Sequence, residues 1–259
     1  MDEKIKQIVQ KIKQKKELAG IDSAIVADVL KSYIKKTRIS INGIKPSEIS
    51  IIVKDVRKEL RNYSGRFQVF SKEWKERGRL LAENRISELL ATHSSTKERI
   101  EFYPEIRKII ASLGVRSILD LGCGLNPLAL ASPEAVYYAS DINAEELSLI
   151  REFFRKNGIK GDVFSCDLRK IENCSLPEAD ICLIFKVLDI LDDKRHKISE
   201  SIIRKVRSNF LLISFSTKTL SGKPMKCPRR FWFERLAKKL GFSFEIIGSK
   251  NENFYLLKR

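Results

Sequence analysis

Apolar side chains recur every three to four positions through about the first 90 residues, which is typical of amphipathic helices. Asp22 and Ser23 precede the second such run and predict a helix N-cap. Pro46, followed by Ser47, opens a third run, and proline is tolerated in a first helical turn. We expect a fourth helix over 71–90. The apolar positions of the first three are Ile5, Ile8, Val9 and Ile12; Ile25, Val26, Val29, Leu30 and Ile34; and Ile49, Ile52, Val53, Val56 and Leu60.

From about residue 100 the pattern changes to short apolar runs that are typical of strands. Most of them are separated by enough residues for a crossover helix, which parallel neighbours require. The last two are joined by a short polar turn, which predicts an antiparallel hairpin. We therefore expect an α/β fold with a Rossmann-like sheet and a C-terminal antiparallel hairpin. The runs are 117–121, 136–141, 161–165, 181–185, 210–215, 242–247 and 254–257.

The charge of the chain favours a polyanionic partner. Its 259 residues include 50 lysines and arginines against 33 aspartates and glutamates, a net charge of +17. Residues 1–90 hold 21 of the basic and 12 of the acidic residues, a net of +9, so the other 169 residues hold +8. This uneven density predicts that the N-terminal helical domain, 1–90, docks on RNA, while the α/β domain is 91–259. The alternative is a helical cap that only packs on the α/β domain.

The first residues are too charged for a secretory signal, and no apolar run approaches the length of a membrane helix. The five cysteines, at positions 123, 166, 174, 182 and 227, show no metal-ligand spacing. We therefore expect a cytoplasmic protein with reduced cysteines, no membrane association and no metal. We expect it to be a monomer.

The strongest local motif lies at 117–127, where an apolar strand runs into a turn with Gly122 and Gly124. Glycine is needed where the backbone takes unusual dihedrals close to a ligand. Pro127 is placed to begin the next helix and stands where a dinucleotide-binding turn has its third glycine. The motif therefore indicates a ligand without a pyrophosphate. Asp120 and Cys123 belong to the same candidate site.

Acidic residues follow the next two strands in order. Asp141 ends the second strand 17 residues after Gly124, where a carboxylate can accept hydrogen bonds from the hydroxyls of a ribose. Asp167 follows the third strand and is placed to accept from an adenine amino group. Each acid has an alternative role as a strand-end or helix-capping residue. Together, with Ile142 and Leu168 beside them, they predict a site for S-adenosylmethionine.

Three motifs, at 93–99, 120–130 and 213–222, resemble those of the aminoglycoside-resistance 16S rRNA methyltransferases. The resemblance implies a class I methyltransferase that modifies guanine N7 at position 1405, in the decoding site of the 30S subunit. It also implies that Arg99 pairs with the methionine carboxylate, a contact that suits a guanidinium, and that His93 and Thr96 belong to the cofactor site. The alternatives are a methyltransferase of tRNA or of another rRNA site, and a non-catalytic RNA-binding homologue.

The fourth strand ends where a target base is expected. Phe185 is a candidate to stack on the base, Lys186 to donate to guanine O6, and Asp189 to accept from N1 and N2. Guanine N7 carries its lone pair without a proton, so we expect no general base. The alternative is that Phe185 belongs to the core and Asp189 caps a helix.

A basic segment between the fifth strand and the next helix, 218–230, contains no acid, one glycine and two prolines, so it predicts a loop. Such a loop suits phosphate contacts, which position RNA without reading its sequence. An aromatic run, 231–233, follows it, and we expect at least two of these three rings in the core. The candidate RNA-binding residues are Lys218, Lys223, Lys226, Arg229 and Arg230.

Overall fold

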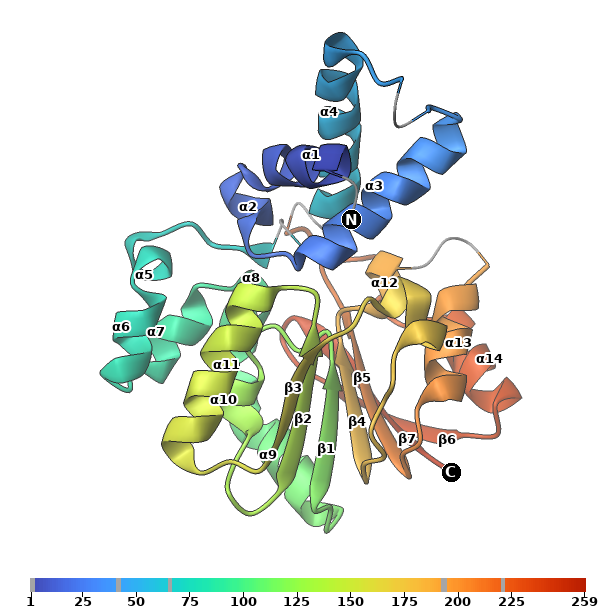
Figure 1. Cartoon of the computed structure of the whole chain (residues 1–259). Coiled ribbons are helices and arrows are strands. Elements are labelled where there is room, and N and C mark those ends of the chain that lie inside the picture. The colour runs from blue at the N-terminus through green and yellow to red at the C-terminus, as the bar shows by residue number, and fades with distance from the viewer. Residues whose placement is uncertain (1–2, 41–42, 65–66, 192–194, 220–221) are drawn as a thin grey trace.

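The computed structural model describes residues 3–40, 43–64, 67–191, 195–219 and 222–259 (Figure 1). A single seven-stranded sheet crosses the molecule in the order β3-β2-β1-β4-β5-β7-β6. The first five strands are parallel to one another, and β7 lies antiparallel between β5 and β6. The strands are β1 (Ser117–Leu121), β2 (Val136–Asp141), β3 (Gly161–Ser165), β4 (Ile181–Phe185), β5 (Phe210–Ser216), β6 (Ser243–Gly248) and β7 (Glu252–Lys258).

The expected sheet is confirmed, and the strand bounds differ only at the end of β5 and in the hairpin. The last strand begins at Glu252, two residues earlier than the apolar run, because Glu252 pairs with β5 and Asn253 pairs with both β5 and β6. A polar residue at such a position gives no strand signal in the sequence. Glu252 is nevertheless only 1% exposed, so the extra length brings a carboxylate into the interior.

Successive side chains of the strands point to opposite faces, and each face has its own core. One face packs against α9 (Tyr103–Ser112), α10 (Pro127–Leu130) and α11 (Ala144–Asn157). The other packs against η3 (Leu168–Asn173), α13 (Lys197–Lys205) and α14 (Phe231–Lys239). Figure 1 shows these helices as two layers on either side of the sheet. Pro127 begins α10, as the sequence predicts.

The N-terminal helices form a third core of their own. They are α1 (Glu3–Lys13), α2 (Lys16–Ala19), α3 (Ser23–Thr37) and α4 (Pro46–Tyr63). The expected cap of α3 is confirmed, because the Asp22 side chain accepts from the amide of Ala24 at 2.8 Å. The unit joins the sheet domain through main-chain bonds: Asp22 N donates to Ile142 O at 2.9 Å, and Ala144 N donates to Gly20 O at 2.7 Å. These bonds place the helices over the carboxyl end of β2.

The single helix expected over 71–90 is wrong. The structure has three short helices, α5 (Lys72–Lys75), α6 (Arg77–Ala82) and α7 (Ile86–Ala91). Asn84 has a φ of 58°, a left-handed conformation that asparagine tolerates and that interrupts a helix. The leucines of α6 and α7 pack in the core of the sheet domain, not with α1–α4. A division of the chain at residue 90 stays a prediction.

The chain continues through α8 (Ser94–Arg99) and η2 (Ile100–Phe102) into α9, and α12 (Leu188–Leu191) follows β4. No helix within the described residues is long and apolar enough to cross a bilayer. Residues 41–42 and 65–66 of the expected helical region, and 220–221 of the expected basic loop, lie outside the described residues.

Candidate active site

A pocket opens at the carboxyl ends of β1 to β4, beneath the end of α4. It brings together most of the residues that the sequence singles out for the donor site and for the target base. Of these, the pocket lining includes His93, Thr96, Gly122, Cys123, Gly124, Asp141, Ile142, Asp167, Leu168, Phe185 and Lys186. Arg99, Asp120 and Asp189 are not among its lining residues. The roles of the individual residues stay predictions.

The turn after β1 requires both glycines. Gly122 has a φ of +68°, and a Cβ there would lie 2.7 Å from Cγ2 of Val187. Gly124 has a φ of +49°, and a Cβ there would lie 3.2 Å from Cε1 of His93. Any other residue would therefore be strained and would fill space at the pocket wall.

Asp141 is held beside this turn by main-chain donors. Gly124 N donates to its Oδ2 at 3.0 Å, while Ile142 N and Asn143 N donate to Oδ1 at 2.7 and 3.0 Å. Burial raises the pKa of Asp141 to about 6, and nearby Glu146 raises it further against these three amides. One oxygen therefore retains a lone pair at the pocket wall that suits a hydroxyl donor.

His93 is a buried, neutral imidazole beneath the glycine turn. Burial lowers the pKa of His93 to about 4, although the charge of Glu146 opposes the shift. Its ring stacks on Phe67, with centroids 5.7 Å apart. Its Nδ1 is buried and has no hydrogen-bond partner among the described residues. A buried polar atom on a pocket wall without a partner is a candidate contact for a ligand.

Asp120 lies behind the pocket and not in it. Its Oδ2 accepts from the hydroxyl of Tyr137 at 2.8 Å and from Nδ2 of Asn126 at 3.3 Å. Burial raises the pKa of Asp120 to about 7 despite both hydrogen bonds. Asn126 does line the pocket, so Asp120 can act on a ligand by orienting the Asn126 amide.

Arg99 is also enclosed, with its side chain 1% exposed. Its Nη2 donates to Glu252 Oε2 at 2.9 Å and to Ser95 Oγ at 3.1 Å. Its Nη1 donates to Asn126 Oδ1 at 2.7 Å, and Nε makes a longer contact with Glu252. Burial opposes the charge, yet Glu252 and Tyr103 outweigh it and raise the pKa of Arg99. Four of its five N–H groups thus have acceptors among the described residues, and the guanidinium carbon lies 5.9 Å from the centroid of the Tyr103 ring.

Glu252 is the central residue that the sequence did not indicate. Its Oε2 accepts from the hydroxyl of Ser214 at 2.6 Å as well as from Arg99, and its Oε1 lies 3.4 Å from Nζ of Lys186. One buried carboxylate therefore holds two cations. No local motif surrounds it, because the partners come from residues 38 to 153 positions away.

Lys186 lies between the donor pocket and a neighbouring cavity, and lines both. It has a φ of 59° and pairs with Glu98 in addition to Glu252. Phe185 is 4% exposed, packs edge-on against Phe254, and lies 4.8 Å from the Arg99 guanidinium carbon. It therefore belongs to the core and to the pocket wall at once.

Asp189 lines the neighbouring cavity and forms an ion pair with Arg230. Nη2 and Nε of Arg230 donate to Asp189 Oδ2 at 2.8 and 2.9 Å. Arg230 is 9% exposed and Arg229 pairs with Glu234, so each has an acidic partner within the protein, and their contact with RNA stays a prediction. Lys223 and Lys226 are exposed, and Lys218 lines the neighbouring cavity.

Of the aromatic run, Phe233 is fully buried and Phe231 is exposed. Trp232 is partly buried and packs against the core, so two of the three rings belong to the core, as expected.

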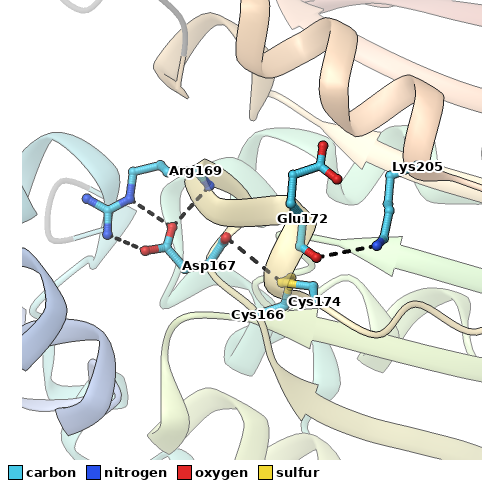
Figure 2. The surroundings of a disulfide bond; sticks show 6 residues. All are labelled: Cys166, Asp167, Arg169, Glu172, Cys174 and Lys205. Carbon is cyan, nitrogen blue, oxygen red and sulfur yellow. Dashed lines mark hydrogen bonds and ion pairs between the residues drawn. A yellow bond between two sulfur atoms is a disulfide. The ribbon is translucent and has the colours of Figure 1, made fainter.

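The segment after β3 forms another part of the pocket wall. Asp167 receives two hydrogen bonds from the guanidinium of Arg169, at 2.8 and 2.6 Å, and caps η3 (Figure 2). A disulfide joins Cys166 to Cys174, so the expectation that all cysteines are reduced is wrong for this pair. The turn of η3 brings their Cα atoms to 5.9 Å, inside the usual range for disulfides, and a spacing of eight residues carries no sequence signature.

The N-terminal helical unit contributes part of the pocket, which the sequence did not indicate. Tyr63, Ser64 and Phe67, at and after the end of α4, line it together with Arg169. The ring of Tyr63 lies 4.3 Å from the Arg169 guanidinium carbon. Within the described residues, no group of three metal-ligating side chains is assembled.

Comparison with known proteins decides the family. Residues 81–256 match the family described as ribosomal RNA methyltransferase (FmrO). The chain belongs to this family. The matched segment contains β1 to β6, the first five residues of β7, and every donor-site residue described above except those from α4 and the segment after it.

The sequence relatives agree with this assignment. A 16S rRNA (guanine(1405)-N(7))-methyltransferase of Serratia marcescens is 31% identical over 187 residues, which cover 69% of this chain and 72% of that protein. The enzyme of the same description from Frankia casuarinae is 29% identical over 186 residues, which cover 67% of this chain and 64% of that protein. The match thus spans just under two thirds of the Frankia enzyme.

Solved structures of the family superpose over nearly the whole chain. The 16S rRNA methyltransferase RmtF, in complex with S-adenosyl-L-homocysteine, has a TM-score of 0.79 at 25% identity and covers 100% of this chain and 99% of its own. The 16S rRNA methylase RmtB has a TM-score of 0.77 at 22% identity and covers 98% of each chain. The similarity therefore includes the N-terminal helices.

Proposed function

We propose that this protein is an S-adenosylmethionine-dependent methyltransferase that modifies guanine N7 in the decoding site of 16S rRNA, within the 30S subunit. The modification is expected to confer aminoglycoside resistance, and the enzyme to act in the cytoplasm. The observation that carries the proposal is the position of Asp141 against the Gly122–Gly124 turn, on one pocket wall of an rRNA methyltransferase chain.

The residues present fit the proposed donor. S-adenosylmethionine supplies an electrophilic methyl group when bound. Asp141 offers an acceptor to the ribose, and the glycines leave the wall open. His93 lines the pocket, and its Nδ1 has no hydrogen-bond partner in the part of the chain that the structure describes. Arg99 donates to Asn126, which lines the pocket, so it can act on the methionine carboxylate through that amide. The similar protein RmtF, whose structure holds S-adenosyl-L-homocysteine, the demethylated form of the donor, supports the same assignment.

The chain's own part in the transfer is positioning. Guanine N7 attacks with a lone pair and has no proton to lose, so no general base is required. What the protein must do is hold the base in line with the methyl group and exclude water. Lys186 lies between the two cavities, where an ammonium can contact a base in the neighbouring cavity. Asp189 would reach the base only by sharing its ion pair with Arg230.

The test is incubation with tritiated S-adenosylmethionine and 30S subunits, beside naked 16S rRNA and tRNA. Modified guanines are then mapped by N7-specific cleavage and primer extension. Label in 30S subunits with a stop in the decoding-site helix is expected, and it should be absent with the Asp141→Ala variant. Label in tRNA or at another rRNA site would replace the proposed substrate. Donor binding without label anywhere would favour the non-catalytic homologue.

A further inference from the structure

The Cys166–Cys174 disulfide encloses a segment that forms part of the wall of the donor pocket. We propose that this pair is a reversible redox site that positions Asp167, Leu168 and Arg169, so that donor affinity follows the oxidation state of the two cysteines. The inference rests on the proposed function, because the ligand whose affinity changes is S-adenosylmethionine.

The bond joins both ends of one short segment. Cys166 follows β3, and Cys174 is the C-cap of η3. The first cysteine is itself tied to the donor site, since Cys166 N donates to the carbonyl of Asp141 at 3.2 Å. The crosslink therefore fixes the end of η3 to the strand register that also places Asp141.

The enclosed segment carries three consecutive residues of the pocket lining. Asp167 accepts from both the amide and the guanidinium of Arg169, so the two side chains act as one unit (Figure 2). Lys170 interrupts the segment with non-helical dihedrals of −122° and 43°. A segment with an internal kink has few main-chain bonds of its own, which makes an added crosslink effective in limiting its motion.

Contacts on the outer side keep this segment folded when the bond is open. Lys170 Nζ lies 3.0 Å from Asp28 of α3, and the Lys205 Nζ of α13 donates to the carbonyl of Glu172 at 3.4 Å. Arg169 lies 3.8 Å from Glu59 of α4. Reduction should therefore loosen the wall of the pocket without unfolding the domain.

The disulfide is reachable from outside. Cys174 is half-buried and lines a second cavity, distinct from the one beside Lys186, which lies between α3 and the β3 edge of the sheet. Cys166 lines this second cavity and the donor pocket. Disulfides in cytoplasmic proteins are rare and are usually catalytic or redox-sensing. A small thiol or disulfide compound entering the second cavity can therefore exchange with the pair.

The chemistry balances with glutathione disulfide as the oxidant. The Cys174 thiolate attacks one sulfur of glutathione disulfide, which forms a mixed disulfide and releases one glutathione thiolate. Cys166, as its thiolate, then attacks the Cys174 sulfur and releases the second. Two electrons pass from the cysteines to glutathione, and the two cysteine protons end on the two glutathione thiols.

The oxidised protein should bind the donor more tightly, because less conformational freedom is lost when the pocket wall is already ordered. We expect the dissociation constant for S-adenosyl-L-homocysteine to rise on the order of tenfold upon reduction, which corresponds to about 1.4 kcal/mol.

The experiment is calorimetric titration of the full-length protein with S-adenosyl-L-homocysteine, after equilibration in oxidised or reduced glutathione. Alkylation and mass spectrometry count the free thiols in each sample. The Cys174→Ser variant should bind like the reduced protein in both buffers. The matched control, Cys227→Ser, removes an exposed free thiol and should keep the full redox response.

Equal donor affinity in the two buffers, with the bond shown to form, would overturn the inference and leave the proposed function intact. Five free thiols under oxidising conditions would also overturn it. Absence of donor binding in both buffers would refute the proposed function itself, and this inference with it. A reduced wild-type protein that is unfolded by circular dichroism would show a purely structural bond and would contradict the expected positioning role.

Discussion

The buried carboxylate of Glu252 offers the sharpest test of how this site is held together. Glu252 and Arg99 each have a side chain only 1% exposed, and Lys186 is 11% exposed. The Glu252→Gln variant keeps the shape and one oxygen acceptor but removes the negative charge between two cations. Removing one partner of a buried pair typically costs about 3 to 5 kcal/mol, because a charge is left buried without compensation.

For a chain of this size, each kcal/mol shifts Tm by about 2 to 4 °C, so the expected fall is roughly 6 to 20 °C. Scanning calorimetry measures it directly. The matched control is Glu245→Gln on the adjacent strand, where Glu245 is 55% exposed and pairs with Lys258 at 3.4 Å. Exposed pairs contribute about 0 to 1 kcal/mol, so this variant should melt within a few degrees of wild type.

Donor affinity gives a second readout for the same variants. Because Glu252 anchors Arg99, the Glu252→Gln protein should bind S-adenosyl-L-homocysteine more weakly even at a temperature where it is fully folded. Equal melting temperatures for the two variants would refute the idea that Glu252 stabilises the paired cations. A lowered Tm with unchanged donor affinity would limit Glu252 to the fold and leave Arg99 without a role in binding.

Three further outcomes are expected. Asp141→Ala should abolish donor binding with the fold intact, and wild-type affinity should fall below about pH 6, where the carboxylate takes up a proton; isothermal titration across pH checks both, and unchanged affinity removes the ribose assignment. The lowered pKa of His93 means that the unfolded state gains the proton first, so wild type should lose up to about 3 kcal/mol relative to His93→Gln as pH falls from about 6.5 to 4, measured by urea unfolding. Lys223→Glu with Lys226→Glu should weaken 30S binding at low salt and flatten its salt dependence in filter binding; a change in donor affinity alone would instead make the loop a cofactor lid.

The hydrophobic pattern by itself determined the sheet and the location of the donor turn. Parallel strands bury both faces, so their apolar runs are plain in the sequence, and their carboxyl ends meet at one edge of the sheet. For that reason the succession of strands along the chain, with the residues at their ends, was enough to predict that Gly122, Gly124 and Asp141 lie together. Gly122 and Gly124 also carry a local conformational requirement, since both have positive φ.

Only the tertiary structure decided which charges are free and which are paired. Arg230 and Asp189 belong to different expected sites, one on a basic loop and one on a substrate wall, yet they form one ion pair. Glu252, the Cys166–Cys174 bond and the contribution of Tyr63 all join segments that no local pattern links. The physical reason is that backbone periodicity is a local property, whereas the pairing of side chains depends on distances that exist only once the chain has folded.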